Sequence, residues 1–372
     1  MRKLLNNPRQ YVDDMLTGLL SAYGDRLVPV GGDPRVLARR DPPPTPRVGV
    51  VTAGGSGHLP LFLGYVGQGM LDGCTVGNVF ASPPARRMAE MIRACNFGRG
   101  VLCVYGNYTG DVMNLSLARE MADFDGIPTA VVLGRDDVAS SPEETRNRRR
   151  GVAGIVYVYK IAGAAAAAGL NLEEVARLAQ KAADHTRSMG VALSPCVLPE
   201  VGRPSFSIAE GRMEIGMGIH GEPGIDESPL LTANETADLM LEKLTADAPL
   251  HAGDEVSVMV NGLGATPLEE LLIVYGRLSR LINERGARVI MPHIGEFATS
   301  MEMTGLSVSL LRVDDELRPP DALHRAFDAH AFQPVVSRAD ARRVEQARKL
   351  VEAAFALPAV AALFRHADEN RV

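Results

Sequence analysis

Apolar residues recur at helical and strand spacings along the first half of the chain. An N-terminal helix ending near residue 23 is predicted by apolar residues that share one face: Val12, Met15, Leu16, Leu19 and Leu20. Short apolar runs predict buried strands at residues 48–51, 100–105 and 129–134. A helical pattern follows at residues 155–169. Another begins after Asn171, where Glu174 completes the pattern of a capping box.

Strands and helices also alternate in the second half. Helical patterns occupy residues 233–244 and 267–283, and strand patterns occupy residues 256–260, 287–291 and 308–313. This alternation predicts a second α/β unit. We therefore expect an N-terminal α/β domain at residues 1–188 and a second at residues 189–317. Residues 318–372 are expected to form a helical extension, with its clearest pattern at 339–355.

The composition narrows the class of protein. The chain has 372 residues, of which 46% are hydrophobic and 23% charged, the balance of a globular α/β protein. Its formal net charge of −6 argues against nucleic-acid binding, because phosphate contacts require a basic face. The four cysteines lack metal-binding spacing, and no apolar run reaches the ~18 residues of a membrane span. We expect a cytoplasmic protein that carries no metal and binds neither nucleic acid nor membrane.

A glycine-rich stretch follows the first predicted strand. Residues 52–58 read Thr-Ala-Gly-Gly-Ser-Gly-His. They lack the Lys-Ser/Thr ending of a phosphate loop, the G-x-G-x-x-G spacing of a dinucleotide fold and the last glycine of a nucleophile elbow. Two interpretations remain. The stretch is a ligand-binding turn at the carboxyl end of a strand, with His58 projecting from it, or a tight turn with a surface histidine.

Two more residues stand in suggestive surroundings. Asp111 follows a predicted strand and begins a helix whose dipole favours the ionised carboxylate, so it is a ligand contact or an ordinary helix-start residue. His220 lies between glycines in residues 217–224, where an imidazole held through one nitrogen can present its other lone pair to an electrophile. An ordinary loop histidine is the alternative. The basic run at residues 145–150 is expected to be solvated, with docking of an anionic partner as the alternative.

Together these motifs are similar to those of the substrate-binding K subunit, or K domain, of the dihydroxyacetone kinases. The resemblance runs from about residue 1 to about residue 317 and rests on seven ordered segments: 54–58 (GGSGH), 80–83 (FASP), 107–114 (NYTGDVMN), 160–164 (KIAGA), 190–196 (GVALSPC), 218–224 (GIHGEPG) and 260–264 (VNGLG). It implies the fold of that K domain, two α/β domains with the substrate site between them.

The resemblance also implies roles for individual residues. His220 attacks the ketone carbon and holds the substrate as a hemiaminal, while His58 and Asp111 contact its hydroxyls and assist proton removal during phosphoryl transfer. The implied substrate-binding residues are Gly55, Ser56, Gly57, His58, Ser82, Asp111 and His220. A hemiaminal requires a carbonyl, so glycerol is rejected by chemistry. Covalent anchoring also positions the reacting hydroxyl, which phosphoryl transfer mainly requires.

Two positions depart from the family pattern. Gly106 stands where a lysine commonly precedes Asn-Tyr-Thr-Gly-Asp, and Leu59 stands where a glutamate commonly follows Gly-His. Both changes spare the implied chemical residues. The loss of a cation and of most of a side chain predicts a roomier, less charged pocket, suited to dihydroxyacetone or to a longer ketose such as erythrulose.

The sequence shows no phosphate loop or acidic metal cluster. The last ~50 residues are also short for a nucleotide-binding domain of about 200 residues. The resemblance implies that a partner L subunit holds ATP, or ADP with Mg²⁺ that a phosphotransferase-system phosphocarrier recharges, and that the chain forms a homodimer. Two alternatives remain open: a catalytically silent ketose-binding regulator, and a free-standing sugar aldolase or isomerase using the same histidines.

Overall fold

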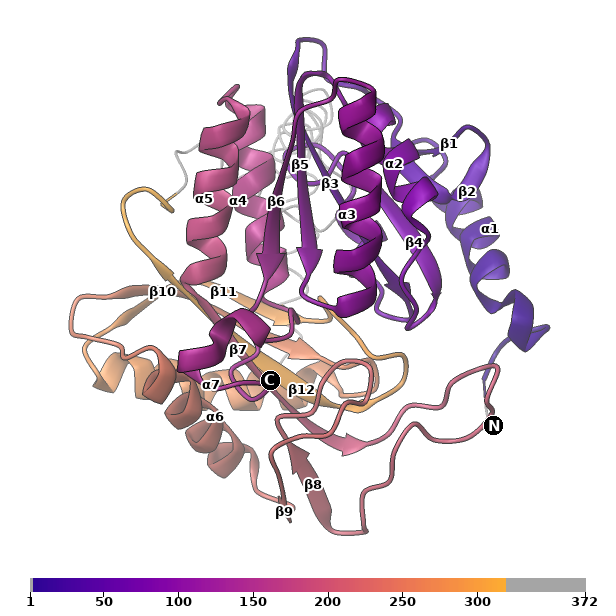
Figure 1. The fold of residues 1–372 in the computed structure, drawn as a ribbon. Helices are drawn as coiled ribbons and strands as arrows, with labels where there is room; N and C mark the ends of the chain where they lie inside the picture. The colour runs from indigo at the N-terminus through magenta and orange to yellow at the C-terminus, as the bar shows by residue number, and fades with distance from the viewer. Residues whose placement is uncertain (1–2, 319–372) are drawn as a thin grey trace, which may run out of the picture. The chain divides into compact units, whose positions relative to one another are not determined.

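Two six-stranded sheets organise residues 3–318, the part of the chain that the computed structural model describes (Figure 1). The first sheet has the order β1-β2-β4-β3-β5-β6. Its strands are β1 (Leu27–Val30), β2 (Asp33–Arg39), β3 (Arg47–Ser56), β4 (Gly73–Val79), β5 (Gly98–Gly106) and β6 (Thr129–Gly134). Strands β4, β3, β5 and β6 run parallel, so their carboxyl ends meet at one edge. Ligands bind at such edges in open α/β sheets.

Helices cover both faces of this sheet, with α2 and α3 on one face and α4 and α5 on the other (Figure 1). The helices up to residue 184 are η1 (Pro8–Gln10), α1 (Tyr11–Tyr23), η2 (Leu63–Tyr65), α2 (Ala85–Ala94), α3 (Thr109–Phe124), η3 (Glu143–Arg148), α4 (Ile155–Ala167) and α5 (Leu172–Asp184). Asn171 caps α5 by accepting a hydrogen bond from the backbone N–H of Glu174, as its sequence predicts.

The second sheet has the order β11-β10-β12-β7-β8-β9. Its strands are β7 (Thr186–Ser194), β8 (Arg212–Ile215), β9 (Asp226–Pro229), β10 (Glu255–Gly262), β11 (Arg288–Gly295) and β12 (Thr304–Val313). β10 and β11 are parallel, whereas β12, β7, β8 and β9 pair antiparallel with their neighbours. The helices α6 (Ala233–Asp247) and α7 (Leu268–Glu284) pack on each other and on this sheet.

The helix α4 connects the two sheets. Almost every one of its side chains is buried. Within it, the Tyr159 hydroxyl lies 2.9 Å from that of Thr52 in β3, and the Tyr157 hydroxyl accepts a 3.0 Å hydrogen bond from Ser257 in β10. The run of alanines at its end lets the backbone approach its neighbours closely, which explains why a helix without a polar face is stable here.

The structure confirms the α/β class and most of the predicted elements. The predicted strands lie within β3, β5, β6, β10 and β12 or, at 287–291, overlap β11, and the predicted helices match α1, α4, α5, α6 and α7. The strands β1, β2, β4, β7, β8 and β9 and the helix α2 were not predicted. Several of these strands are four residues long or carry proline or glycine, as Pro29 in β1 and Gly77 in β4 do, and these features are typical of loops in a sequence.

The predicted glycine turn after residue 51 is wrong in its position. Strand β3 continues through Gly54 and Gly55 to Ser56. These glycines serve close packing: a Cβ on Gly54 would lie 2.2 Å from the Phe62 ring, and one on Gly55 would lie 2.7 Å from the backbone nitrogen of Ala81. The turn begins at Gly57, whose φ is +104°.

The expectation of a solvated basic run at residues 145–150 is also wrong for its last two members. Arg149 is 1% exposed and forms a buried ion pair with Asp247. Arg150 pairs with Asp137, which is itself buried. A row of arginines in sequence does not reveal that carboxylates from distant segments meet two of them.

The proposed domain boundary at residue 188 stays a prediction; strand β7, which belongs to the second sheet, begins at Thr186. The helix expected at 339–355 lies outside the described residues. Within residues 3–318, no helix combines the length and apolar character needed to cross a membrane.

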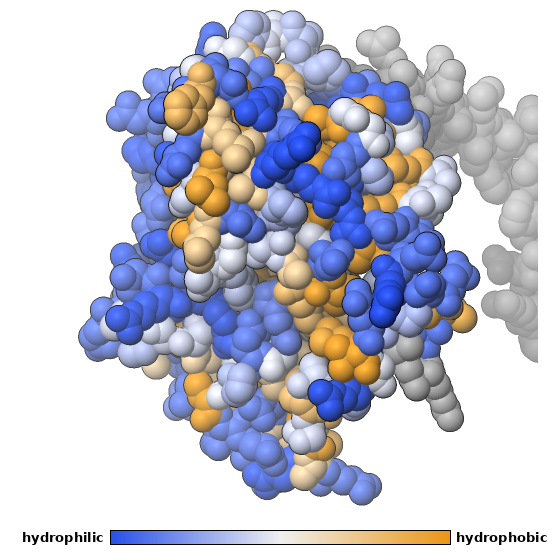
Figure 2. Space-filling view, turned by 45° about the vertical axis from the view of Figure 1, so that its right-hand side comes forward, coloured by the Kyte–Doolittle hydropathy of each residue, from blue (hydrophilic) through white to orange (hydrophobic). Residues whose placement is uncertain are grey.

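An exposed apolar line runs along the outer face of α3 (Figure 2). It consists of Met113, Leu117, Met121 and Phe124, spaced three or four residues apart. This spacing places the four side chains on one side of the helix. A contiguous exposed apolar surface of this kind is typical of interaction sites.

Two helix-interior glycines allow a matched test of the packing around α4. A methyl group on Gly163 of α4 would lie 2.5 Å from the carbonyl oxygens of Gly69 and Met70, whereas one on Gly276 of α7 would meet nothing within 4 Å. We expect Gly163→Ala to lower the free energy of unfolding by about 1–3 kcal/mol. Gly276→Ala should raise it by about 0.5–1 kcal/mol. Chemical denaturation measures both, and equal effects would contradict the packing described.

Candidate active site

His220 lies in the loop between β8 and β9, among aromatic rings contributed by the first sheet. Its ring centroid is 4.8 Å from that of His58, 5.1 Å from that of Phe80 and 4.7 Å from that of Tyr108. His58 and Phe80 follow β3 and β4, and Tyr108 precedes α3. The predicted site residues His58 and His220 are therefore in contact, although they lie far apart in the sequence.

A carboxylate fixes the orientation of His220. Glu222 Oε1 lies 2.9 Å from Nδ1 of His220, and its Oε2 accepts a 2.9 Å hydrogen bond from the backbone N–H of the same residue. Burial alone would raise the pKa of Glu222, but the hydrogen bond and charge of His220 outweigh it and lower the pKa to about 2. An ionised carboxylate only accepts hydrogen bonds, so in the neutral form of His220 the proton sits on Nδ1 and the lone pair is on Nε2.

His58 is held neutral in the core. It is 1% exposed, its Nδ1 donates a 2.8 Å hydrogen bond to the Thr299 carbonyl, and its ring stacks on Phe80. Burial, reinforced by the nearby His220, lowers the pKa of His58 to about 3. Its buried Nε2 has no hydrogen-bond partner among the described residues. Buried polar atoms are rarely left unpaired, so this nitrogen is a candidate contact for a bound molecule.

Asp111 is a second buried group with an unpaired atom. It lies in the first turn of α3, is 6% exposed, and has no hydrogen-bond partner for Oδ1 within residues 3–318. Burial raises the pKa of Asp111 to about 6, although a hydrogen bond from Ser82 and the nearby His220 oppose the shift. A carboxylate with a pKa this close to neutrality is suited to accept a proton in catalysis.

Residues 55–57 of the glycine-rich stretch make contacts within the protein at the end of β3. The Ser56 hydroxyl donates a 2.8 Å hydrogen bond to the Gly77 carbonyl, and the carbonyl of Gly57 accepts one from Met301. Gly55 packs against the backbone of Phe80 and Ala81. The contact of Gly55, Ser56 and Gly57 with substrate stays a prediction, since these residues shape the end of β3 from which His58 projects.

Sequence reasoning missed the residues that surround His220. Glu222 lies in the segment 217–224, where the sequence pointed to His220 alone. Phe80 and Tyr108 lie in the segments 80–83 and 107–114, which carried no prediction for these two rings. A Cβ on Gly106 would lie 3.1 Å from the Tyr108 ring, so the extra room expected beside Gly106 is occupied by that ring.

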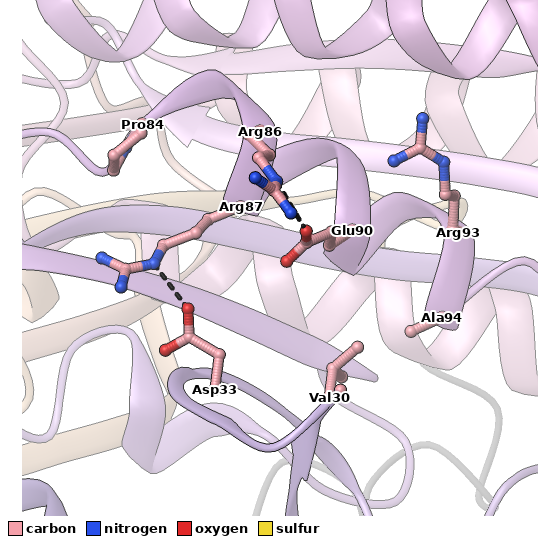
Figure 3. Close-up of a pocket in the computed structure, with 9 residues that line it drawn as sticks. Val30, Asp33, Pro84, Arg86, Arg87, Glu90, Arg93 and Ala94 are labelled. Carbon is pink, nitrogen blue, oxygen red and sulfur yellow. Dashed lines mark hydrogen bonds and ion pairs between the residues drawn. The ribbon is translucent and has the colours of Figure 1, made fainter.

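A hollow in the surface lies away from this cluster. It has a volume of about 860 Å³ and borders α2 and the β1–β2 turn (Figure 3). Its arginines are paired: Arg87 with Asp33 at 2.7 Å and Arg86 with Glu90 at 3.1 Å. In the described part of the chain, no group of three or more histidine, cysteine, aspartate or glutamate residues is arranged to hold a metal ion.

His58 and His220 meet at the carboxyl edge of the parallel strands of the first sheet, where ligands bind in open α/β sheets. The model of the Dak1 domain matches residues 17–331, and the chain belongs to this family. It is 44% identical over 333 residues to the PTS-dependent dihydroxyacetone kinase 2, dihydroxyacetone-binding subunit DhaK, of Listeria innocua serovar 6a, covering 90% of this chain and 99% of that protein.

Other relatives are longer or carry different names. The chain is 42% identical to the L-erythrulose kinase of Pectobacterium atrosepticum over 90% of its own length, but spans only 56% of that protein. The crystal structure of the C. freundii dihydroxyacetone kinase matches with a TM-score of 0.76 and 32% identity, over 88% of this chain and 59% of that one. The dihydroxyacetone kinase operon co-activator Dha-DhaQ matches with a TM-score of 0.77 and 32% identity, over 81% and 92%.

The buried neutral His58 should make stability depend on pH. The unfolded chain binds a proton at this histidine below pH 6.5, whereas the folded protein does so only near pH 3, so stability falls as the pH drops through this window. We expect the free energy of unfolding of wild type to lose up to about 1.4 kcal/mol per pH unit more than that of His58→Gln between pH 6 and 5. Denaturant titrations measure the slopes. The exposed His251→Gln is the control, and a slope unchanged by His58→Gln would contradict the assignment.

Proposed function

We propose that this chain is the ketose-binding subunit of a dihydroxyacetone-type kinase and that His220 holds a small ketose as a hemiaminal. The observation that carries the proposal is the meeting of three groups. The oriented imidazole of His220 contacts the ring of His58 and is near enough to Asp111 for its charge to affect the pKa of that carboxyl. Within residues 3–318, Nε2 of His58 and Oδ1 of Asp111 are buried without hydrogen-bond partners. A ketose offers what each lacks: an electrophilic carbon for His220 and hydroxyls for the other two.

The covalent step follows from the hydrogen bond to Glu222. The lone pair on Nε2 of His220 forms the N–C bond, the π electrons of the carbonyl move to its oxygen, and that oxygen takes up a proton from solvent, which leaves the positive charge on the ring. The imidazolium that results keeps its Nδ1 proton hydrogen-bonded to the ionised Glu222, so the charge that develops on the ring meets a carboxylate already in place.

The transfer step uses Asp111 as the base. With the ketose anchored, one hydroxyl is held beside the carboxylate, which takes its proton as the oxygen attacks the phosphoryl donor. His58 accepts a hydrogen bond from another hydroxyl through its free Nε2 or serves as an alternate base. Holding the reacting oxygen in place supplies much of what phosphoryl transfer requires.

The proposed substrates are dihydroxyacetone and a longer ketose such as erythrulose. Two sets of relatives support both, because one is named for dihydroxyacetone binding and another for erythrulose phosphorylation. The requirement for a carbonyl excludes glycerol in either case. Tyr108, which occupies the space beside Gly106, forms the wall against which a fourth carbon would lie.

We propose that a nucleotide-binding partner subunit holds the phosphoryl donor. The donor is either ATP, or ADP with Mg²⁺ to which a phosphotransferase-system phosphocarrier supplies the phosphate. The relative from Listeria innocua, of which 99% is matched by this chain, is named a dihydroxyacetone-binding subunit, which supports an enzyme divided between subunits. The apolar line on α3 begins at Met113, two residues after Asp111, where a donor has to approach. A homodimer of this chain also remains a proposal.

A second candidate is a ketose-binding regulator without kinase activity. The match to the operon co-activator favours it, at the same identity as the match to the C. freundii kinase. The buried Asp111 with its raised pKa argues for the kinase, since a sensor needs no base. Phosphorylated ketose formed with a nucleotide-binding subunit and ATP identifies the kinase, whereas ketose binding without product identifies the regulator.

The covalent anchor predicts a mass adduct. Wild-type protein is incubated with dihydroxyacetone or erythrulose, desalted rapidly without chemical reduction, and measured by intact-protein mass spectrometry. It should gain the mass of one ketose, whereas incubation with glycerol should give no adduct. His220→Ala should abolish the adduct because the attacking nitrogen is gone, while His251→Ala, at an exposed position, should keep it. An adduct of undiminished yield on His220→Ala would refute the anchor.

The base predicts a separate loss. Asp111→Asn should keep the adduct but reduce kcat of the reconstituted kinase by about 10²–10⁴-fold, because the amide cannot take the hydroxyl proton. In wild type, kcat should fall as the pH drops below about 6, since protonation removes the base. Asp123→Asn, exposed on the same helix, is the control. Steady-state assays between pH 5 and 8 test this, and near-wild-type activity of Asp111→Asn would leave Asp111 as a helix-start residue only.

A further inference from the structure

Arg150 connects Glu222 to a buried carboxylate. Its Nε and Nη2 lie 2.9 and 2.8 Å from Asp137 Oδ2, its Nη2 donates a 3.2 Å hydrogen bond to the Gly216 carbonyl, and its Nη1 lies 3.8 Å from Glu222 Oε2. Asp137 is 1% exposed. The guanidinium is therefore fixed on one side by buried partners and faces the residue that orients His220 on the other.

The backbone leaves room for this arrangement only because residue 218 is glycine. A Cβ on Gly218 would lie 2.2 Å from Glu222 Oε2 and 2.5 Å from Arg150 Nη1. The carboxylate and the guanidinium thus pack over the bare Cα of Gly218, in the same loop that carries His220. The loop accommodates both side chains together.

We propose that Arg150 is a positioning residue for the covalent step, holding Glu222 against His220 so that the lone pair stays on Nε2. This inference rests on the proposed function and adds a residue that acts through Glu222 without touching the ketose. The basic run at residues 145–150 thereby gains a role that the sequence did not indicate.

Electrostatics explain why the guanidinium is needed. The titratable and charged groups that act on Glu222, or on which Glu222 acts, are His220, Arg150, His58 and Tyr108. Arg150 is the permanent cation in this set and lies between Asp137 and Glu222. Burial raises the pKa of Asp137 to about 7 and Arg150 opposes this shift, so Asp137 becomes neutral when Arg150 is removed. Glu222 would then have no fixed cation beside it, and its side chain, which is 30% exposed, would be free to turn towards solvent. The Nδ1 proton of His220 would then lose its acceptor, and the proton could reside on Nε2, which removes the attacking lone pair.

The neighbouring Arg149 is a matched control. It is as deeply buried as Asp137, and it pairs with Asp247 on α6, donating a 2.9 Å hydrogen bond from Nη1. It also donates from Nε to the Ser141 carbonyl at 2.7 Å. A replacement here disturbs a buried ion pair in the same segment without changing the surroundings of Glu222.

The direct test is the tautomer of His220 in the ketose-free protein. ¹⁵N NMR of histidine-labelled protein, assigned with His220→Ala, should show one tautomer with the proton on Nδ1 in wild type. Arg150→Met should show a mixture and bind dihydroxyacetone as the adduct about tenfold more weakly. Arg150→Lys, which keeps the charge but not the two-sided contact, should recover part of the loss, and Arg149→Lys should match wild type in both readouts.

The outcomes separate this inference from the proposed function. Absence of any ketose adduct on wild type would refute the anchor, yet the tautomer of His220 would still report on Arg150. An unchanged tautomer and affinity in Arg150→Met, or an equal loss in Arg149→Lys, would overturn the role of Arg150. Should Arg150→Met fail to fold, Gly218→Ala decides, because its methyl group displaces Glu222 and Arg150 and leaves the first sheet untouched; wild-type behaviour of that variant would overturn the inference.

Discussion

The hydrogen bond between Nδ1 of His220 and Glu222 is the constraint on which the site depends. An imidazole can carry its proton on either nitrogen, and only one choice leaves Nε2 able to attack carbon. The loop favours the tautomer with the proton on Nδ1 because the carboxylate of Glu222 accepts a hydrogen bond there. The same carboxylate also accepts a hydrogen bond from the backbone N–H of His220. Gly218 gives the carboxylate room, and Arg150 lies behind it. The nucleophile is thus prepared by orientation, before any ligand binds.

Around this bond the protein retains groups that lower its stability. His58 Nε2 and Asp111 Oδ1 are buried without partners among the described residues, and an unpaired buried polar atom costs about 1–3 kcal/mol. A folded protein can retain such unpaired groups only when the surrounding packing holds their side chains in position. Here that packing is visible: the Thr299 carbonyl fixes the His58 ring, Phe80 stacks on it, and α4 joins the two sheets through Tyr157 and Tyr159. Buried polar atoms without hydrogen-bond partners, when they cluster, are typical of a ligand-binding site.

The sequence could predict the elements with a strong period and the residues within glycine-rich motifs. It could not predict partners brought in by the fold. Apolar runs located β3 and β5, and spacing located α5 with its Asn171 cap, because these signals are local. The burial of Arg149 depends on Asp247, nearly a hundred residues later, and the setting of His58 depends on Thr299. Local motifs pointed to His220, His58 and Asp111, and a family resemblance implied their roles. The residues that surround them follow from tertiary contacts that no single segment encodes.

The same distinction governs how Gly106 is interpreted. Read as a sequence, a glycine in place of lysine means more room and less charge. In the structure the Tyr108 ring lies 3.1 Å from where a Cβ would be and 4.7 Å from the His220 ring, measured between centroids in the second case. A side chain at position 106 has to displace the Tyr108 ring, and that ring also contacts His220. The space beside residue 106 and the surroundings of His220 are therefore coupled through one aromatic ring, and a change at residue 106 alters both.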